Sequence, residues 1–340
     1  MNSRDLFHSA ISLMEVERPP FWIMRQAGRY LPEYRKLKEK YSFVEIVKNP
    51  ELCLEVALQP MERFDFDCSI LFSDILVVSE ALGFAYGFKE TGGIYLERKI
   101  ECEKDIENIS VEGIREKLSY VAEALKLLRK TLPNKAVLGF SASPFTLGAY
   151  MIEGSSSKDN FPKYREFIEK SPELFNALMQ KLTEAISEYA QMQIECGIDG
   201  FQIFDSHASL CNEETYGKLS GSWTSSLISS MEARARTILY AKGLNNCFGE
   251  LAKIGADAYS VDSSMKLSEL KQKWVAPYAL QGNLDQTMLE TASPDEVKKA
   301  VREIVDDMKN ERGHIFNLGH GITPNAKLEN VYAICEAIKE

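Results

Sequence analysis

Gly200-Phe-Gln-Ile-Phe-Asp-Ser-His207 indicates the fold class most clearly, because a short apolar run ends in polar side chains. Strands buried on both faces in parallel sheets have this length and composition. The same order of apolar run, polar or glycine residues and helical stretch recurs along the chain. The runs that we expect to be strands are Phe21–Met24, Cys68–Phe72, Val137–Ser141, Gly200–Phe204, Thr237–Ala241, Ala258–Val261, Tyr278–Leu280 and His314–Leu318.

The segments between these runs have the periodicity of helices. In Ser171–Cys196, apolar residues recur at intervals of three or four, which is the pattern of one helix face. These residues are Leu174, Leu178, Leu182, Ile186 and Tyr189. Ser171 is suited to the N-cap and Pro172 to the first helical position, so we expect the helix to begin there.

Eight strand–helix units predict a (β/α)8 TIM barrel of the α/β class, with residues 1–340 in a single domain. A doubly wound open sheet is the alternative, but no Gly-x-Gly-x-x-Gly follows any of the predicted strands. No linker divides the chain, and α/β barrels often hold this much chain in one domain. The polar segment Gly154–Asn160 is expected to be a surface loop or a lid.

The charge of the chain limits its partners. Forty Lys and Arg against fifty Asp and Glu give a formal net charge of −10. General nucleic-acid binding usually needs a basic face, so we expect no nucleic-acid partner. An anionic small substrate remains compatible with this charge, because a few arginines can make a positive site on an acidic protein.

Cysteine usage and hydropathy indicate the compartment. The seven cysteines are scattered, odd in number and form no Cys-x-x-Cys pair, which fits a reducing environment better than a disulfide framework. Residues 1–17 carry four charged side chains and lack the apolar core of a signal peptide. No apolar stretch approaches the length needed to cross a bilayer. We therefore expect a soluble, cytoplasmic protein without a membrane partner.

Polar residues follow most of the predicted strands. In (β/α)8 barrels the catalytic groups lie at the C-terminal ends of the strands, so these residues are expected to converge. They are Arg25–Arg29, Ser73-Asp74, Asp205–His207, Lys242-Gly243, Asp262, Gly282-Asn283 and Gly319–Gly321. Most of them have an alternative role as caps or turns. A block with two arginines around a glycine is poorly explained in that way.

That block also carries a family resemblance. Phe21-Trp-Ile-Met-Arg-Gln-Ala-Gly-Arg-Tyr-Leu-Pro-Glu-Tyr-Arg35 strongly resembles the signature of uroporphyrinogen decarboxylases. Further segments resemble that family in the family's own order. They are Leu71-Phe-Ser-Asp-Ile-Leu76, Ser143-Pro-Phe-Thr-Leu-Gly-Ala-Tyr-Met-Ile-Glu-Gly154, Phe204-Asp-Ser-His-Ala208 and Asn317-Leu-Gly-His-Gly-Ile322.

The resemblance spans nearly the whole chain and implies both architecture and activity. It implies a single-domain barrel that pairs into homodimers and acts without a metal or other cofactor. It implies a carboxy-lyase of porphyrin and haem biosynthesis. The enzymes of that family convert the four acetate side chains of uroporphyrinogen III to methyls and so give coproporphyrinogen III.

Arg25 and Arg29 are suited to a substrate with eight carboxylates, because a guanidinium binds a carboxylate with two hydrogen bonds. If their segment turns helically, the two side chains share one face. The resemblance places Gln26, Ala27 and Gly28 in the same substrate-binding loop. Gly28 would permit close backbone approach and an unusual dihedral angle, and Ala27 would supply a backbone amide. A pair of structural arginines that bridge loops is the alternative.

Asp74 would repel a polyanion unless it binds something else. The four pyrrole N–H groups at the substrate's centre supply that purpose, and the family has an aspartate at this position. Alternatively, Asp74 caps the helix that follows. Tyr150 and Ser206 match family positions that bind substrate. His320 lies in Gly-His-Gly at the end of the last predicted strand and can donate to a carboxylate. Taken alone, Tyr150 and Ser206 are more often packing and turn residues, and His207, although beside Ser206, is left out of the predicted site.

The expected chemistry needs no pyridoxal or thiamine, because a protonated pyrrole can accept the electron pair that loss of CO2 leaves. Asp74 and Arg25 are the candidate catalytic residues. We expect Asp74 to orient the ring and to stabilise positive charge on it. The proton donor stays open: a guanidinium is a very weak acid. Burial would raise the pKa of Asp74, whereas neighbouring arginines would lower it.

Two other functions are compatible with parts of the sequence. Alkyl-transfer enzymes of the same barrel superfamily hold zinc with His and Cys, and His207 with Cys211 is the nearest pair here. No further matching cysteine lies near the last strand, where His320 stands instead. A protein that only binds or stores tetrapyrroles would need the arginines but no acid.

Overall fold

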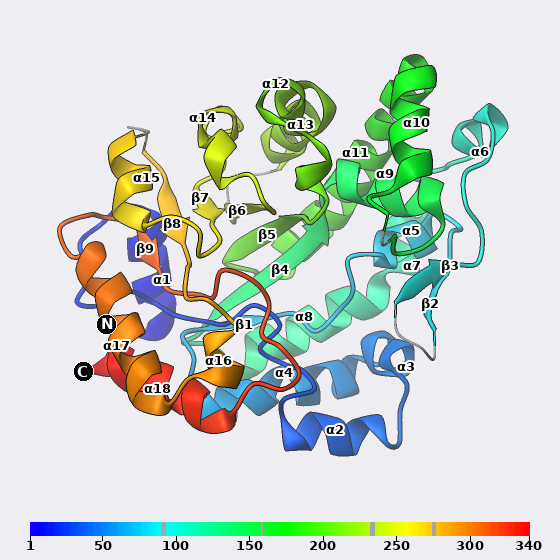
Figure 1. Cartoon of the computed structure of the whole chain (residues 1–340). Coiled ribbons are helices and arrows are strands. Elements are labelled where there is room, and N and C mark those ends of the chain that lie inside the picture. Colours follow the sequence, from blue (N-terminus) through cyan, green and yellow to red (C-terminus); the bar gives the residue numbers. More distant parts are fainter. Residues whose placement is uncertain (90–92, 158, 232–234, 274–276) are drawn as a thin grey trace.

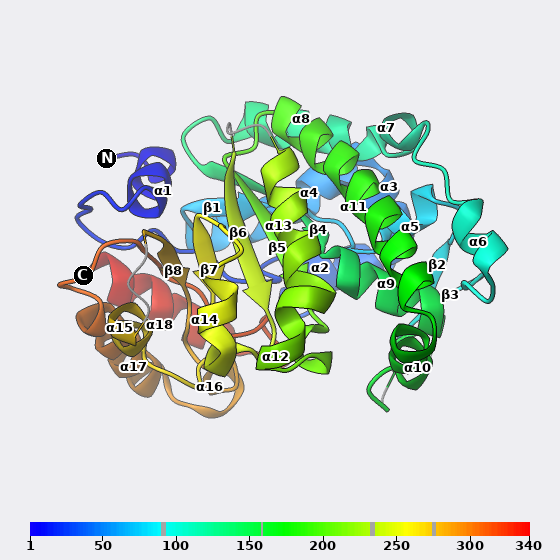
Figure 2. The same ribbon diagram turned by 90° about the horizontal axis from the view of Figure 1, so that it is seen from above.

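The computed structural model describes residues 1–89, 93–157, 159–231, 235–273 and 277–340. Its strands are β1 (Cys68–Ile70), β2 (Tyr86–Phe88), β3 (Ile94–Leu96), β4 (Ala136–Ala142), β5 (Gly200–Asp205), β6 (Arg236–Ala241), β7 (Ala258–Ser260), β8 (Ala279–Gln281) and β9 (His314–Ile315). Seven of them form one parallel sheet in the order β1-β4-β5-β6-β7-β8-β9, and β2 pairs with β3 in a separate antiparallel ribbon. Figures 1 and 2 show the curved sheet and the helices around it.

The helices occupy the segments between strands. They are α1 (Ser3–Ile11), α2 (Pro32–Lys38), α3 (Phe43–Lys48), α4 (Pro50–Phe64), α5 (Val77–Ala81), α6 (Glu103–Glu107), α7 (Ile114–Lys117), α8 (Ser119–Thr131), α9 (Pro144–Glu153), α10 (Pro162–Lys170), α11 (Pro172–Glu195), α12 (Glu213–Tyr216), α13 (Ser222–Ser230), α14 (Phe248–Leu251), α15 (Leu267–Lys273), α16 (Met288–Thr291), α17 (Pro294–Asp307) and α18 (Leu328–Lys339). Two short 3-10 turns, η1 (Ala208–Leu210) and η3 (Asn245–Cys247), and a π-helical turn, η2 (Gly217–Gly221), complete them.

Seven of the eight predicted strands are confirmed, because β1 and β4 to β9 fall on the apolar runs. The eighth strand predicted at 21–24 is not confirmed. That segment makes a single parallel bridge, between Phe21 and Phe316. Pro20 has no N–H to donate, and Met24 begins a turn. The structure therefore confirms an α/β fold with a seven-stranded parallel half-barrel and leaves the closed eight-stranded barrel unconfirmed.

The segment around Phe21 nevertheless lies between the two edge strands. Its backbone oxygen accepts from the amide of Asp67, just before β1, and the amide of Trp22 donates to the oxygen of Phe316, just after β9. The indole N–H of Trp22 donates to Oε1 of Gln281 at 2.8 Å, and Nε2 of Gln281 donates to Oε1 of Gln202 at 3.0 Å. Buried polar side chains thus link this segment to β8 and β5.

The amino ends of the strands are joined by aspartates, of which Asp67 and Asp199 are buried and Asp257 is half-buried. The carboxylate of Asp199, just before β5, accepts the amide of Val137 on β4 at 2.9 Å. Asp67 accepts the amide of Phe21 in the same way, and Asp257 accepts that of Thr237. Each carboxylate also pairs with arginine: Asp67 with Arg18, Asp199 with Arg4 and Arg129, and Asp257 with Arg236. These three aspartates, the amino-end clamps, hold neighbouring segments together at the amino ends of the strands. The predicted site lies at the opposite, carboxyl ends.

Helix α11 confirms the periodicity of Ser171–Cys196, since it begins at Pro172 and buries Leu178, Leu182 and Ile186. Ser171 is its N-cap residue but makes no side-chain capping bond, so that detail of the prediction is wrong. All seven cysteines are free. In the described ranges, no helix is long and apolar enough to span a membrane.

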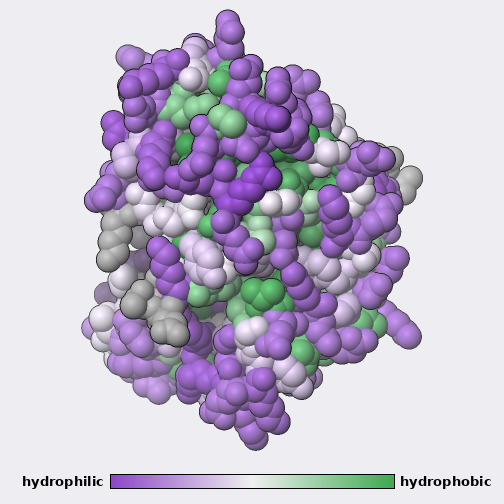
Figure 3. Space-filling view, turned by 90° about the vertical axis from the view of Figure 1, so that its right-hand side faces the viewer, coloured by the Kyte–Doolittle hydropathy of each residue, from purple (hydrophilic) through white to green (hydrophobic). Residues whose placement is uncertain are grey.

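The segment predicted to be a loop or lid is a loop where it is described. Gly154 ends α9 in the left-handed conformation, and Ser155 bridges to Tyr95 on β3. Residue 158 lies outside the described residues. Figure 3 shows that the face on this side of the molecule is mainly hydrophilic, with small apolar patches between the polar side chains.

Candidate functional site

The carboxyl ends of the strands bring several predicted residues together. The turn after Phe21 meets the loop after β9, because the amide of Ile322 donates to the oxygen of Met24. The ring of His320, in that loop, faces Tyr240 of β6 edge-on, with 6.3 Å between centroids. Asn283, after β8, donates to the backbone oxygen of Asp262, after β7. The convergence expected from the sequence is therefore present around these loops.

Arg25 lies in a turn and not in a helix, so the condition under which Arg25 and Arg29 would share a helical face is not met. Its φ of 65° is in the left-handed region that residues other than glycine rarely adopt. This conformation directs the exposed side chain over Gly321, where an added Cβ would be 2.6 Å from Cδ of Arg25. Gly28 does not take a positive φ, contrary to expectation. It does permit close approach, because its Cβ would be 3.1 Å from the backbone oxygen of Arg25.

The rest of the loop divides between structural and accessible groups. The side chain of Gln26 is buried and its bonds are internal: Nε2 donates to the oxygen of Cys68 at 3.2 Å, and Oε1 accepts the amide of Ile23. Its backbone groups are bonded as well, because the N–H donates to the oxygen of Ile23 and the oxygen accepts the hydroxyl of Tyr30 at 2.7 Å. Gln26 therefore shapes the loop. Ala27 and Gly28 are half-buried, and Arg29 is exposed. Arg29 is separated from Arg25 by the turn.

Asp74 follows β1 and faces the same end of the sheet. Its Oδ1 accepts the amide of Leu76, the N-cap residue of α5, at 2.8 Å. Burial raises the pKa of the Asp74 carboxyl to about 6, although the amide of Leu76 and the charge of Arg25 act to lower it. Burial therefore outweighs the arginine. Asp74 also has the capping role considered as the alternative, because its Oδ1 binds the amide of the residue before α5. Its Oδ2 accepts no such bond from the described residues.

Tyr150 is buried on α9, and its ring packs against Phe161 and His207 at centroid distances of 5.8 and 5.0 Å. Burial and the charge of Asp74 raise the pKa of Tyr150 to about 12, against a lowering by Arg25. The hydroxyl is therefore protonated at neutral pH and can donate to a carboxylate. Its electrostatic coupling to Asp74 and Arg25 places the three side chains in one neighbourhood.

Ser206 directly follows β5 and is half-buried. His320 is also half-buried. Burial lowers its pKa, and the positive charges of Lys242 and Arg25 lower it further, so the ring is neutral near pH 7. Lys242, exposed after β6, was not among the predicted site residues. It belongs to the same electrostatic neighbourhood, because it also lowers the pKa of His207, which burial and this charge hold at about 4.

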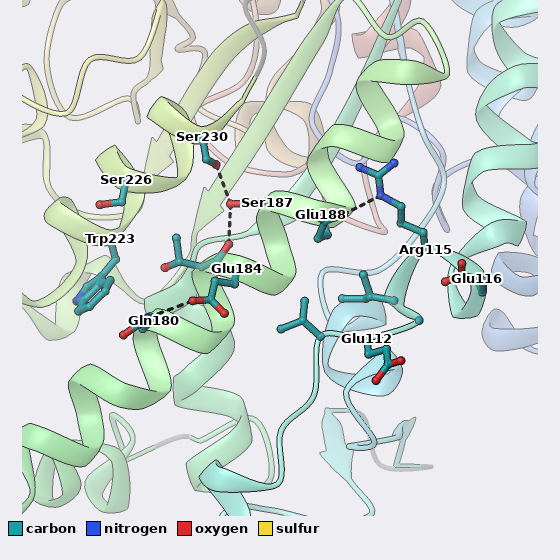
Figure 4. A pocket seen from close by; sticks show the side chains of 14 residues that line it. Glu112, Arg115, Glu116, Gln180, Glu184, Ser187, Glu188, Trp223, Ser226 and Ser230 are labelled. Atoms are coloured by element: carbon teal, nitrogen blue, oxygen red, sulfur yellow. Dashed lines mark hydrogen bonds and ion pairs between the residues drawn. The ribbon is translucent and has the colours of Figure 1, made fainter.

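A pocket elsewhere on the surface does not suit a polyanion. It has a volume of about 750 Å³ and lies between α7, α11 and α13 (Figure 4). Four glutamates line it: Glu112, Glu116, Glu184 and Glu188. The single lining arginine, Arg115, is paired with Glu188 and Glu195. None of the predicted site residues lines this pocket.

The zinc-dependent alternative finds little support in the ligand set. Cys211 is buried, and burial holds the pKa of its thiol far above the usual range. Over the ranges that the structure describes, no group of three or more His, Cys, Asp or Glu side chains is arranged to hold a metal.

Comparison of the structure with solved structures shows the fold. A methyltransferase from Methanosarcina mazei matches with a TM-score of 0.84 and 23% sequence identity, covering 100% of this chain and 98% of that one. At this identity the likeness concerns the fold alone.

Comparison of the sequence shows the family. The family model described as uroporphyrinogen decarboxylase (URO-D) matches residues 2–340. The uroporphyrinogen decarboxylase of Ruthia magnifica is 37% identical over 330 residues, covering 95% of this chain and 94% of its own. That of Chlorobium phaeobacteroides is 36% identical over 347 residues, covering 100% and 98%. With one model and full-length relatives in agreement, the chain belongs to the uroporphyrinogen decarboxylase family.

Proposed function

We propose that the protein is a cofactor-independent uroporphyrinogen decarboxylase, which converts the four acetate side chains of uroporphyrinogen III to methyls and gives coproporphyrinogen III. The observation that carries the proposal is Asp74. Its pKa of about 6 and its proximity to the cation Arg25 suit a group that meets pyrrole N–H donors inside a site for carboxylates. Family membership supports the same activity.

The reaction requires a proton before it can release CO2. Protonation of the ring carbon next to the one that bears the acetate makes the pyrrole an electron acceptor, and the electrons of the broken C–C bond then form a double bond from the exocyclic carbon to the ring. A proton added to the exocyclic carbon completes the methyl, and the ring carbon gives its proton up. One proton is consumed for each CO2. The tetrapyrrole itself is the electron sink.

Each site residue has a role in this proposal. Asp74 accepts from the pyrrole N–H groups and stabilises the positive charge on the ring. Arg25 binds the carboxylate of the reacting acetate, and Arg29 binds a carboxylate further from the ring centre. Hydroxyl, imidazole and backbone groups bind the remaining carboxylates. These come from Tyr150, Ser206, His320, Ala27 and Gly28, while Gln26 shapes the loop that presents the last two.

The choice of proton donor lies between Asp74 and Arg25. A carboxyl with a pKa of about 6 is present in both protonation states near neutral pH, whereas a guanidinium stays protonated. Asp74 is therefore the stronger candidate for the acid, and Arg25 for binding. The two roles of Asp74 belong to successive protonation states of the same carboxyl.

The proposal also covers the quaternary state, a homodimer, and the architecture, a closed eight-stranded barrel. We expect a single-domain, cytoplasmic homodimer, as in the family resemblance, and light scattering of the purified protein measures its mass. The segment at Phe21 would act as the eighth strand of the (β/α)8 barrel. Its backbone bonds to the neighbours of both β1 and β9 support this role.

Anaerobic incubation with uroporphyrinogen III tests the activity. The expected products are coproporphyrinogen III and four CO2 per ring. Arg25→Lys keeps the charge but loses the two-pronged hydrogen bonding, and we expect kcat/KM to fall about 10- to 100-fold. Tight binding of uroporphyrinogen without any CO2 would indicate a tetrapyrrole-binding protein instead.

A further inference from the structure

Asp205, the last residue of β5, is fully buried and accepts hydrogen bonds from three hydroxyls. The hydroxyls of Ser143 and Thr146 donate to its Oδ1 at 2.8 and 2.9 Å. The hydroxyl of Ser220 donates to Oδ2 at 2.7 Å. The carboxylate thereby connects the first turn of α9 with β5 and with the π-helical turn η2, an element that is frequent at functional sites.

The bond to Ser143 fixes the start of α9. Ser143 is the N-cap residue, and its oxygen accepts the amide of Thr146 at 3.0 Å while its proton is donated to Asp205. A serine hydroxyl can do both at once, and Asp205 selects the orientation in which the lone pair faces the helix. One carboxylate therefore ties the first turn of α9 to the end of β5, beside the backbone bond from the amide of Ser143 to the oxygen of Phe204.

Thr146 connects this carboxylate to the site. Its Oγ1 also accepts the amide of His207 at 3.2 Å. Thr146 and Tyr150 are four residues apart on α9 and so lie on the same helix face. Tyr150 packs against the ring of His207. Asp205 is thus connected to His207 through Thr146 and Tyr150 as well as along the chain. Ser206 lies between Asp205 and His207 in the sequence.

We infer that Asp205 is a positioning residue, which acts through Thr146 to hold Tyr150 and Ser206 in the geometry that substrate binding requires. Its burial prevents contact with substrate, so it cannot act directly. Three hydroxyl donors to one carboxylate fix both its oxygens and the side chains that donate to them. The inference rests on the proposed function, in which Tyr150 and Ser206 bind substrate carboxylates.

Thr146→Val tests this with little change of shape, because it replaces only the hydroxyl that bonds Asp205 and His207. We expect kcat/KM for uroporphyrinogen to fall on the order of 10- to 100-fold, since misplacement of binding groups has this effect. Thr146→Ser keeps the oxygen and should restore most of the activity. Asp205→Asn should weaken the same bonds; if it does not fold, the threonine pair decides.

Two further measurements separate positioning from general destabilisation. Asp257→Asn removes a carboxylate at the amino end and should lower the melting temperature while leaving kcat/KM unchanged. The pKa of His207, measured by NMR titration with the signal assigned from His207→Gln, should rise from about 4 in Thr146→Val because the ring becomes hydrated.

Wild-type kinetics together with an unchanged pKa of His207 in Thr146→Val would overturn the inference. An equal loss of activity in Asp257→Asn would overturn it as well. Failure of the wild type to decarboxylate would instead overturn the proposed function, and the His207 titration would still test the positioning.

Discussion

Arg25 and Gly321, almost three hundred residues apart, are in direct contact: the space of a Cβ on Gly321 is occupied by the side chain of Arg25. The left-handed backbone of Arg25 directs its side chain to this place, and the bond between Ile322 and Met24 fixes the two loops beside it. The conformation of the proposed carboxylate-binding arginine therefore depends on a residue without a side chain in the last strand's loop.

Gly321→Ala should displace Arg25 more than it disturbs the fold. The atoms that it would meet, Cδ, Cγ and Nε, belong to a flexible side chain that can move. We expect kcat/KM to fall about 10-fold or more. The melting temperature should change by only a few degrees. Steady-state kinetics and thermal melts measure both, and a variant with normal kinetics would show that the contact does not orient Arg25.

Asp74→Asn should remove most of the activity and stabilise the protein. Loss of a positioned acid or charge stabiliser costs on the order of 100- to 10,000-fold in kcat. Because the folded pKa of Asp74 lies above its usual value, ionisation of this carboxyl opposes folding once the pH exceeds the ordinary range. Asparagine keeps the acceptor for Leu76, so the variant should gain on the order of 1–3 kcal/mol at pH 8 and little at pH 4.

The pH dependence of the wild type distinguishes the two roles of Asp74. If the protonated carboxyl is the acid, kcat should fall as the pH rises through about 6; if only the anion acts, kcat should fall as the pH drops through that value. We expect the first behaviour. A profile that is flat between pH 5 and 8 in the wild type, or the same limb in Asp74→Asn, would exclude Asp74 as its source.

Gln26→Ala should impair folding before binding. The side chain is buried and bonds to backbone groups of Cys68 and Ile23, so its removal leaves two buried polar groups without partners. Each such group costs about 1–3 kcal/mol. Denaturant unfolding should show this loss, with KM close to the wild-type value in the fraction that folds. A raised KM at unchanged stability would instead assign the side chain to the substrate.

Asp199→Asn should weaken the amino end of the sheet in a pH-dependent way. Burial acts to raise the pKa of Asp199, but bonds from His8, the amide of Val137 and Arg4 outweigh it, so the pKa is lowered. A lowered carboxyl pKa stabilises the fold above the ordinary value of about 3.9 and ceases to do so as the pH falls below it. The variant should lose about 1–3 kcal/mol at pH 7, since the buried side chain loses its charge-assisted bonds to the partly exposed Arg4 and Arg129. Urea midpoints should show the two proteins converging toward pH 3.

Elements that depend on local pattern were predictable. The ends of β4 and β5 agree with their apolar runs to within one residue, and α11 agrees with its periodic apolar residues. The spacing of apolar side chains reflects which positions an element buries. The run at Phe21 has the composition of a strand, yet it forms only a bridge, since proline and the turn at Arg25 interrupt the backbone ladder. Composition does not show that interruption.

The site residues stay a prediction, and their geometry could not be derived from the sequence. Family resemblance and strand-end position identify Asp74, Tyr150 and His320, whose electrostatic coupling to Arg25 the structure now describes. The internal bonding of Gln26 and the left-handed Arg25 depend on contacts with distant segments. The balance between burial and Arg25 at Asp74 is a three-dimensional quantity, and no spacing in the sequence encodes it.

The amino-end clamps have a consequence for how this molecule can change. Three aspartates, Asp67, Asp199 and Asp257, join neighbouring segments at the amino ends of the strands, opposite the proposed site. Substitutions in the loops at the carboxyl ends leave these bonds in place. A library that randomises those loops while keeping the three aspartates should yield many folded variants, and the scaffold would be a practical starting point for redesign toward other anionic ring substrates.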